Sequence, residues 1–241
     1  MELGPGVPTP PIELAGGATD ATAETHASRV TVSDSLAERL AATGAVVERG
    51  HDVLAESGRD WWPLAMTWAT AGRTPALASA LVRPTDAAQV SEVLAICNEE
   101  RVPVTPSAGR SGVLGGSVPL FGGVQLDLCS LAGLRSVDDE SLIVDVGAGT
   151  FGDHFENELR ESHALTCGHW PQSMTLSTVG GWLACRVRAS SRPGTERSRT
   201  WSWASTWCWP TAPRSPPEVL HDRPPGPTST SCSSDRRGPW G

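Results

Sequence analysis

The composition of this 241-residue chain changes abruptly after Arg186. Up to that residue, apolar segments alternate with Gly-containing turns and mixed charge, which is typical of a folded α/β domain. Residues 187–241 are instead rich in Arg, Pro, Ser and Thr, hold five of the ten Trp, and contain no Phe and almost no Leu, Ile or Val. Because a hydrophobic core needs such side chains, we expect residues 187–241 to form a disordered tail.

The net charge also changes sign after Arg186. The whole chain has a net charge of -8, while residues 187–241 carry eight Arg against four acids, or about +4. The first 186 residues therefore carry about -12 (-8 minus 4), which argues against nucleic acid or an anionic membrane as a partner. The six Cys have no metal-ligand spacing, so we expect no metal site and a reduced, cytoplasmic protein. No apolar run reaches the roughly 18 residues of a transmembrane helix.

The beginning of the chain is expected to contribute little to the core. Residues 1–28 lack the basic and apolar regions of a signal peptide, and we interpret them as a disordered lead. Residues 29–76 are predicted to be a helical segment in which Ser33 caps a helix and Leu36 and Leu40 lie one turn apart. The block RDWWPLAM (59–66) then gathers aromatic residues, which favours an aromatic plug against the domain over a substrate contact.

Residues 77–186 alternate between strand and helix patterns. A strand ending at Pro84 precedes a helix that we expect Thr85 to cap, and two short strands follow, VPVTP and VQLDL. This order predicts a βαβ unit with parallel strands. A second α/β piece then begins with a hairpin that turns at Asp138–Glu140, followed by a helix start at Thr150.

Small residues fill the loop after VPVTP. The candidate binding residues of this loop are Pro106, Ser107, Ala108, Gly109, Arg110, Ser111 and Gly112. Small side chains let main-chain N–H groups surround a phosphate, and the Arg and Ser side chains could add charge and hydroxyl donors. The loop lacks both the Walker lysine and the GxGxxG fingerprint, so an ordinary glycine-rich turn is an equally good interpretation of it alone.

The block GHWPQSMTLSTVGGWLACR (168–186) is the second candidate feature. Its small polar residues lead into Gly180 and Gly181, where a planar ring or another main chain could approach closely. The alternative is a loop followed by the start of a buried helix. We interpret His169 as a structural hydrogen-bonding residue rather than a catalytic base.

Together, the blocks RDWWPLAM, RPTDAAQV, VPVTPSAGRSG and GHWPQSMTLSTVGGW resemble the FAD-binding domain of the vanillyl-alcohol-oxidase type of flavoprotein. Within that family they resemble the alkyldihydroxyacetone-phosphate synthase branch. The resemblance covers roughly residues 58–186 and implies FAD as the cofactor. It also implies an α/β (α+β) fold, in which a PCMH-type FAD-binding domain of two small α/β subdomains, here incomplete, spans residues 77–186.

The same resemblance implies how FAD would be held. Residues 106–112 would cradle the pyrophosphate. The flavin and ribityl chain would be lined by Gln172, Ser173, Met174, Ser177 and Thr178. One departure is Ser107-Ala108, where many relatives have glycines, so a left-handed conformation would be less comfortable there.

After GGWLACR the sequence leaves the pattern of the family. Read one base earlier, the codons of residues 187–241 are compatible with the family motifs G-A-G-Q, S-T-R-Y-G-K and G-S-E-G-T-L-G. We therefore interpret residues 187–241 as an out-of-frame translation, and the alternative is a genuine disordered tail.

The resemblance implies a fragment of an FAD-linked oxidoreductase or of an enzyme like alkyldihydroxyacetone-phosphate synthase. Intact members of the synthase branch use a lipid-like substrate, a long-chain alcohol. The alternatives are a fragment of an FAD-dependent 2-hydroxy-acid dehydrogenase and a non-catalytic, unstable frameshift product. The cap and the C-terminal catalytic residues of the family are not recognisable here, so we assign no catalytic residue. Because the missing segment should supply strands, we expect a colourless, aggregating preparation, which would favour the non-catalytic product.

Overall fold

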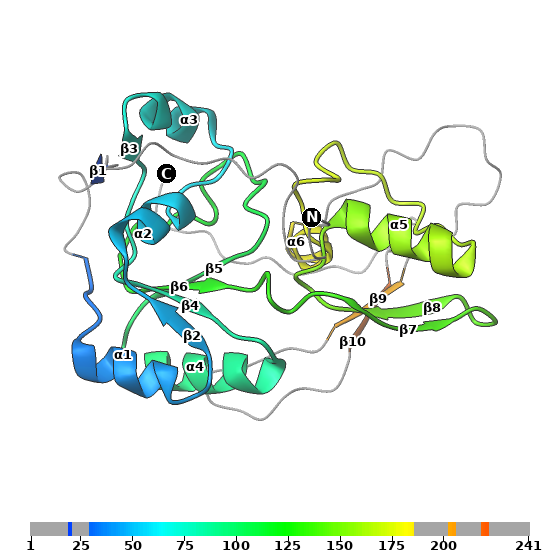
Figure 1. The fold of residues 1–241 in the computed structure, drawn as a ribbon, viewed down its shortest axis with the longest axis horizontal. Helices are drawn as coiled ribbons and strands as arrows, with labels where there is room; N and C mark the ends of the chain where they lie inside the picture. Colours follow the sequence, from blue (N-terminus) through cyan, green and yellow to red (C-terminus); the bar gives the residue numbers. More distant parts are fainter. Residues whose placement is uncertain (1–18, 21–28, 186–201, 206–217, 222–241) are drawn as a thin grey trace, which may run out of the picture.

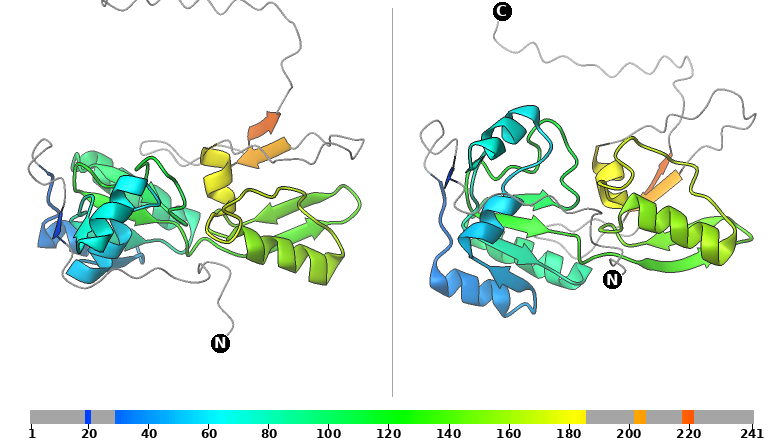
Figure 2. Two further views of the ribbon diagram at one scale, coloured as in Figure 1. Left: turned by 90° about the horizontal axis from the view of Figure 1, so that it is seen from above. Right: turned by 45° about the horizontal axis from the view of Figure 1, so that its top comes forward.

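The computed structural model describes residues 19–20, 29–185, 202–205 and 218–221 (Figure 1). Two lobes lie side by side: the first lobe is residues 29–128 and the second lobe is residues 131–185. Helix α6 (Val179–Ala184) belongs to the second lobe and lies between the two in all three views (Figure 2). The mixed α/β fold that the sequence predicts is confirmed.

A four-stranded sheet forms the centre of the first lobe. Its strands lie in the order β2 (Val46–Glu48), β4 (Ala80–Arg83), β6 (Val124–Asp127) and β5 (Val104–Ser107). Strands β4 and β5 are both parallel to β6, as the βαβ pattern predicted, although β6 lies between them. Strand β2 pairs antiparallel with β4. It was not predicted, because three residues are too few to show the alternation of apolar and polar side chains that indicates a strand.

Helices cover both faces of this sheet (Figure 1). Helices α1 (Asp34–Ala41) and α4 (Ala87–Glu99) lie on one face, and α2 (His51–Ser57) lies on the other. Successive side chains of β4 point to opposite faces of the sheet, and all three are apolar. Ala80 and Val82 join the cluster with α1 and α4, while Leu81 joins Leu54 of α2. Helix α3 (Pro63–Thr70) follows, with Pro at its start.

Two predicted helix caps have different outcomes. Ser33 caps α1 as predicted, since its side chain accepts a hydrogen bond from Leu36 N at 3.2 Å. The prediction for Thr85 is wrong. Asp86 is the residue in extended conformation directly before α4, and its carboxylate accepts from Ala88 N at 2.7 Å and Gln89 N at 2.9 Å.

The second lobe is a hairpin with one helix packed on it. Strands β7 (Leu134–Asp138) and β8 (Ile143–Val146) pair antiparallel, which confirms the predicted turn. Helix α5 (Gly152–His163) packs on β7 and follows Phe151, which has no capping side chain. The predicted cap at Thr150 is therefore wrong; its hydroxyl donates instead to Gly147 O at 2.7 Å. The buried core of this lobe consists of Phe155, Leu159, Cys167, Met174, Val179 and Trp182.

Short strand pairs lie near both ends of the chain. Strand β1 (Thr19–Asp20) pairs parallel with β3 (Arg73–Thr74), and β9 (Ser202–Ser205) pairs antiparallel with β10 (Glu218–His221). The rest of the predicted lead and of the tail, including the frame change after Arg186, lies outside the described residues.

Candidate functional site

The structure brings the two predicted binding segments together where the lobes meet. We call residues 106–112 and 172–178, taken together, the seam. A Cβ added at Gly109 would collide with the carbonyl oxygen of Leu176 and lie 3.1 Å from Cε1 of Phe151. Residues 67 positions apart (176 minus 109) are thus in main-chain contact, and only glycine fits at this point.

The first segment of the seam leaves its main-chain donors uncommitted. Ser107 ends β5 and is buried, and its carbonyl accepts from Leu128 N at 2.9 Å. Within the described part of the chain, no protein acceptor takes a hydrogen bond from the N–H groups of residues 108–112. The left-handed position of this segment is Arg110, with a φ of 53°, rather than Ser107 or Ala108. The segment therefore has the donors that a phosphate needs.

The RDWWPLAM block braces the loop that continues from this segment. Trp61 N donates to the carbonyl oxygen of Gly112 at 2.9 Å, and the ring of Trp62 lies against Gly115. Burial raises the pKa of Asp60, although main-chain N–H groups around its carboxylate, including that of Trp62, act in the opposite direction. These contacts support the interpretation of the block as a packing element.

Gln125 ties the same loop to α2. This side chain is fully buried in β6, and its Nε2 donates to Ser57 O at 2.8 Å and to Ser117 O at 3.0 Å. One amide thus joins the end of α2 to the far end of the glycine-rich loop.

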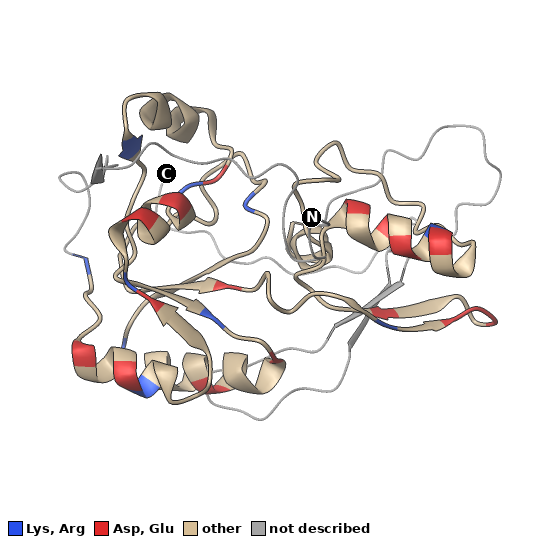
Figure 3. Ribbon diagram, in the orientation of Figure 1, with Lys and Arg blue, Asp and Glu red and all other residues tan. Residues whose placement is uncertain are grey.

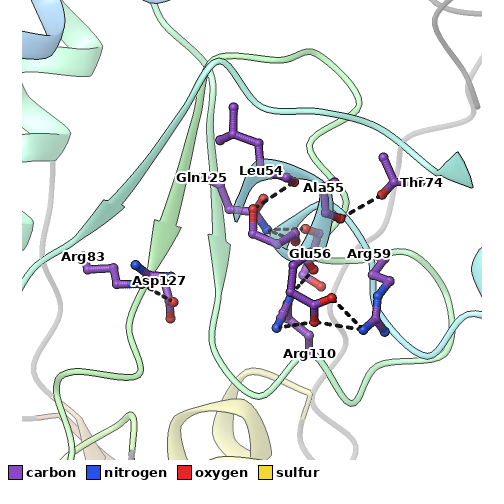
Figure 4. A network of polar contacts seen from close by, with 11 residues as sticks. Leu54, Ala55, Glu56, Arg59, Thr74, Arg83, Arg110, Gln125 and Asp127 are labelled. Carbon is purple, nitrogen blue, oxygen red and sulfur yellow. Dashed lines mark hydrogen bonds and ion pairs between the residues drawn. The ribbon is translucent and has the colours of Figure 1, made fainter. Parts of the chain in front are cut away.

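A carboxylate on α2 holds two arginines beside the seam (Figure 4). Glu56 accepts from Nη2 of Arg59 at 2.8 and 2.9 Å, and from Nη2 of Arg110 at 3.4 Å. Nη1 of Arg110 also donates to the carbonyl oxygen of Glu56. A cavity of about 290 Å³ adjoins this cluster; it is lined by Asp52, Val53, Glu56, Ser57, Arg83, Ser107, Arg110 and Asp127.

Internal hydrogen bonds shape the second segment of the seam. Ser177 Oγ accepts from the indole Nε1 of Trp182 at 2.6 Å and donates to Ser173 O at 2.8 Å. Thr178 caps α6 by accepting from Gly181 N at 3.2 Å. Met174 is buried in the core of the second lobe, whereas Gln172 is exposed. Ser177, Thr178 and Met174 therefore order the segment.

The start of α5 is fastened to the same segment. Gly152 N donates to Ser177 O at 3.0 Å, and Val179 N donates to Thr150 O at 2.9 Å. These two bonds set the second segment directly beside Phe151, the residue that also faces Gly109.

His169 lies in the core of the second lobe. It is 4% exposed, and its ring centroid lies 4.7 Å from that of Trp182 in an edge-on arrangement. Burial lowers the pKa of His169, which favours the neutral imidazole. This packing against an aromatic ring agrees with a structural role. The predicted hydrogen bonding is not observed, because Nε2 of His169 is buried without a hydrogen-bond partner among the described residues.

Acidic side chains mark the helices of both lobes, including α1, α2 and α5 (Figure 3). Across the described residues, no group of three or more His, Cys, Asp or Glu side chains is arranged to hold a metal ion. Among the same residues, no helix has the length and apolar character needed to span a membrane.

For several site residues the sequence gave no sign of a contact with the loop. Glu56, Asp60 and Gln125 contact the loop from distant positions, and Phe151 contacts it from the other lobe. Each looks locally like an ordinary helix, turn or strand residue, so only the tertiary contacts identify them.

Residues 78–195 match the family described as FAD binding domain. D-lactate dehydrogenase of Anaerostipes hadrus is 36% identical over 106 residues, which are 43% of this chain and 22% of that protein. Alkyldihydroxyacetonephosphate synthase of Caenorhabditis elegans is 25% identical over 120 residues, covering 48% of this chain and 20% of that protein. The chain therefore spans less than a quarter of the length of these relatives.

A solved structure of alkyldihydroxyacetonephosphate synthase has the same fold, with a TM-score of 0.63 at 17% identity. The similarity covers 88% of this chain and 38% of that one. The family match shows that residues 78–195 carry an FAD-binding domain, and the shared fold agrees with it.

Proposed function

We propose that FAD binds across the seam. The observation that carries this proposal is the contact of Gly109 with Leu176, because it sets a row of uncommitted N–H groups beside the second segment. Main-chain donors in such a concavity suit the two negative charges of a pyrophosphate. When bound, FAD supplies a ring system that accepts and returns electron pairs.

The residues have separate roles in this proposal. Those of the first segment, from Pro106 to Gly112, hold the pyrophosphate, and the hydrogen bond from Trp61 N to the carbonyl oxygen of Gly112 keeps the end of this main chain in place. Gln172, Ser173 and the main chain as far as Thr178 lie along the flavin and ribityl chain. Met174, Ser177 and Thr178 fix the course of that main chain through burial and hydrogen bonds.

We further propose that the chain derives from an enzyme like alkyldihydroxyacetone-phosphate synthase, whose lipid-like substrate would meet the flavin. The shared fold and the motif blocks support this reading. A specific observation favours a second candidate, a 2-hydroxy-acid dehydrogenase: the D-lactate dehydrogenase is 36% identical in the matched region, against 25% for the synthase.

Binding is tested by titrating the full chain with FAD and following the quenching of flavin fluorescence. We expect saturable binding with one FAD per chain, competition by ADP, and weaker binding of riboflavin, which lacks the pyrophosphate. No saturable binding at FAD concentrations up to the millimolar range would contradict the proposal. Purification without a yellow colour would not, because FAD is added in the titration.

The two enzyme classes are separated by turnover. The chain with its reading frame restored is assayed for reduction of a dye acceptor by D-lactate, and for exchange of the acyl group of acyl-dihydroxyacetone phosphate for a long-chain alcohol. Alkyl exchange without dye reduction supports the synthase class. Dye reduction alone supports the dehydrogenase class.

A further inference from the structure

Arg110 occupies an unusual conformation at the centre of the first segment. Its φ is 53°, in the left-handed region that residues with a Cβ seldom adopt. Such conformations persist only where the surroundings hold them, and they gather at binding sites. The contacts that hold Arg110 therefore bear on how the cofactor is bound.

The side chain of Arg110 is turned toward α2 (Figure 4). Nη1 donates to the carbonyl oxygen of Glu56, and Nη2 lies 3.4 Å from the Oε1 atom of the same residue. The first acceptor is a main-chain carbonyl that any residue at position 56 supplies, whereas the second is the carboxylate, so only the contact of Nη2 depends on the Glu56 side chain.

Glu56 is itself held from its other side. Arg59 is 4% exposed, and its Nη2 lies 2.8 and 2.9 Å from the two carboxylate oxygens of Glu56. A buried guanidinium thus fixes the carboxylate that receives Arg110. The arrangement forms a chain of contacts from the interior of the first lobe to the pyrophosphate segment.

From these contacts we infer that Glu56 is a positioning residue for the cofactor. By holding the guanidinium of Arg110 on α2, it keeps the main chain at position 110 left-handed and the N–H groups of residues 108–112 available to the pyrophosphate. The main chain of the segment, and not the guanidinium, contacts the phosphates. This inference rests on the proposed binding of FAD across the seam.

If Glu56 acts in this way, FAD binding needs it only when the residue at position 110 has a Cβ. Glycine adopts the left-handed conformation without an anchor, whereas alanine needs one and has no guanidinium to be held. FAD dissociation constants are therefore compared for the full chain and for R110A, R110G, E56Q and E56Q/R110G. E99Q is the matched control, because Glu99 is exposed and pairs with Arg39, away from the seam.

We expect R110A to bind FAD about tenfold more weakly than R110G. E56Q should weaken binding by about tenfold with Arg110 present, and by less than twofold in the R110G background. E99Q should bind like the unchanged chain. If R110A and R110G lose affinity equally, or if E56Q has no effect with Arg110 present, the inference is wrong. If R110A and R110G lose FAD affinity equally, and their affinity also varies less with salt concentration than that of the unchanged chain, the guanidinium contacts the phosphates.

A second measurement needs no cofactor. Trypsin cleaves after arginine, so E56Q should raise the rate of cleavage after Arg110 relative to cleavage after the exposed Arg101, while E99Q should leave the ratio unchanged. An unchanged ratio in E56Q would overturn the positioning role. If the unchanged chain fails to bind FAD, the proposed function fails, and the trypsin ratio still decides whether Glu56 holds the segment.

Discussion

Gly109 lies against the carbonyl oxygen of Leu176, and this contact joins the two lobes at the point where both predicted binding segments meet. Neither residue has a side-chain role in the contact. The geometry depends on the absence of a Cβ at one position and on the course of the main chain at the other.

The first prediction concerns this contact. G109A should lower the free energy of unfolding by about 1–3 kcal/mol, because the added methyl group meets a carbonyl oxygen that cannot move aside without shifting the segment. Chemical denaturation measures the change. G116A is the matched control, since a Cβ there has no neighbour within 4 Å. Equal stability of the two variants would show that the lobes are not in contact at Gly109.

The second prediction concerns the hydrogen bond that Ser177 receives from Trp182. S177A should lower the free energy of unfolding by about 1–3 kcal/mol, because the buried indole N–H of Trp182 loses its acceptor. S173A is the control, since the bond at Ser173 uses its carbonyl group and survives the substitution. Thermal unfolding of the two variants gives the comparison; a larger loss in S173A would contradict this hydrogen-bond pattern.

The third prediction is a pH dependence. Burial alone would raise the pKa of Glu156, but hydrogen bonds from Thr166, Cys167 and Arg160 outweigh it and leave this pKa below its usual value. The carboxylate is thus held more strongly in the folded chain than in the unfolded chain. Its contribution is complete above the unfolded pKa, about 4.3, and is lost as the pH falls through the folded pKa.

E156Q should therefore lower the free energy of unfolding by about 2 kcal/mol at pH 7. This difference from the unchanged chain should shrink below about pH 4. E158Q is the control on the same helix, at an exposed position. Urea unfolding across this pH range measures both variants. A difference for E156Q that stays constant down to pH 3 would show that the carboxylate is not held in this way.

Local patterns predicted the repeating elements of the fold. The N-cap at Ser33, the parallel strands and the hairpin at Asp138–Glu140 are all confirmed, because each depends on residues close together in the sequence. The caps at Thr85 and Thr150 were wrong. In both cases the residue next to the predicted one occupies the extended position before the helix, a one-residue difference that composition does not determine.

The site was only partly predictable, because many of its contacts join residues that are far apart in the sequence. The sequence identified the two segments, because small residues are visible in it. It gave no sign of the contacts that Glu56, Asp60 and Gln125 make with the loop, since these residues come from α2, the connection between α2 and α3, and β6. The left-handed conformation at Arg110 was also unexpected, because the comparison with the family pattern had pointed to Ser107 and Ala108 instead.

The fourth prediction concerns the frame change after Arg186. We propose that residues 187–241 are an out-of-frame translation, and the family match ends close by, at Thr195. Sequencing the genomic DNA around the codon of Arg186 tests this proposal. We expect that reading one base earlier gives an uninterrupted frame that encodes S-T-R-Y-G-K and later G-S-E-G-T-L-G. Stop codons in that frame before the end would contradict it.

We propose that FAD is held where Gly109 meets Leu176. The most direct measurement is a titration of the full chain, G116A and G109A with FAD under conditions in which all three are folded, followed by flavin fluorescence. We expect saturable binding of one FAD by the full chain and by G116A, and an affinity at least tenfold lower for G109A. Folded G109A that binds FAD as tightly as the unchanged chain would contradict it.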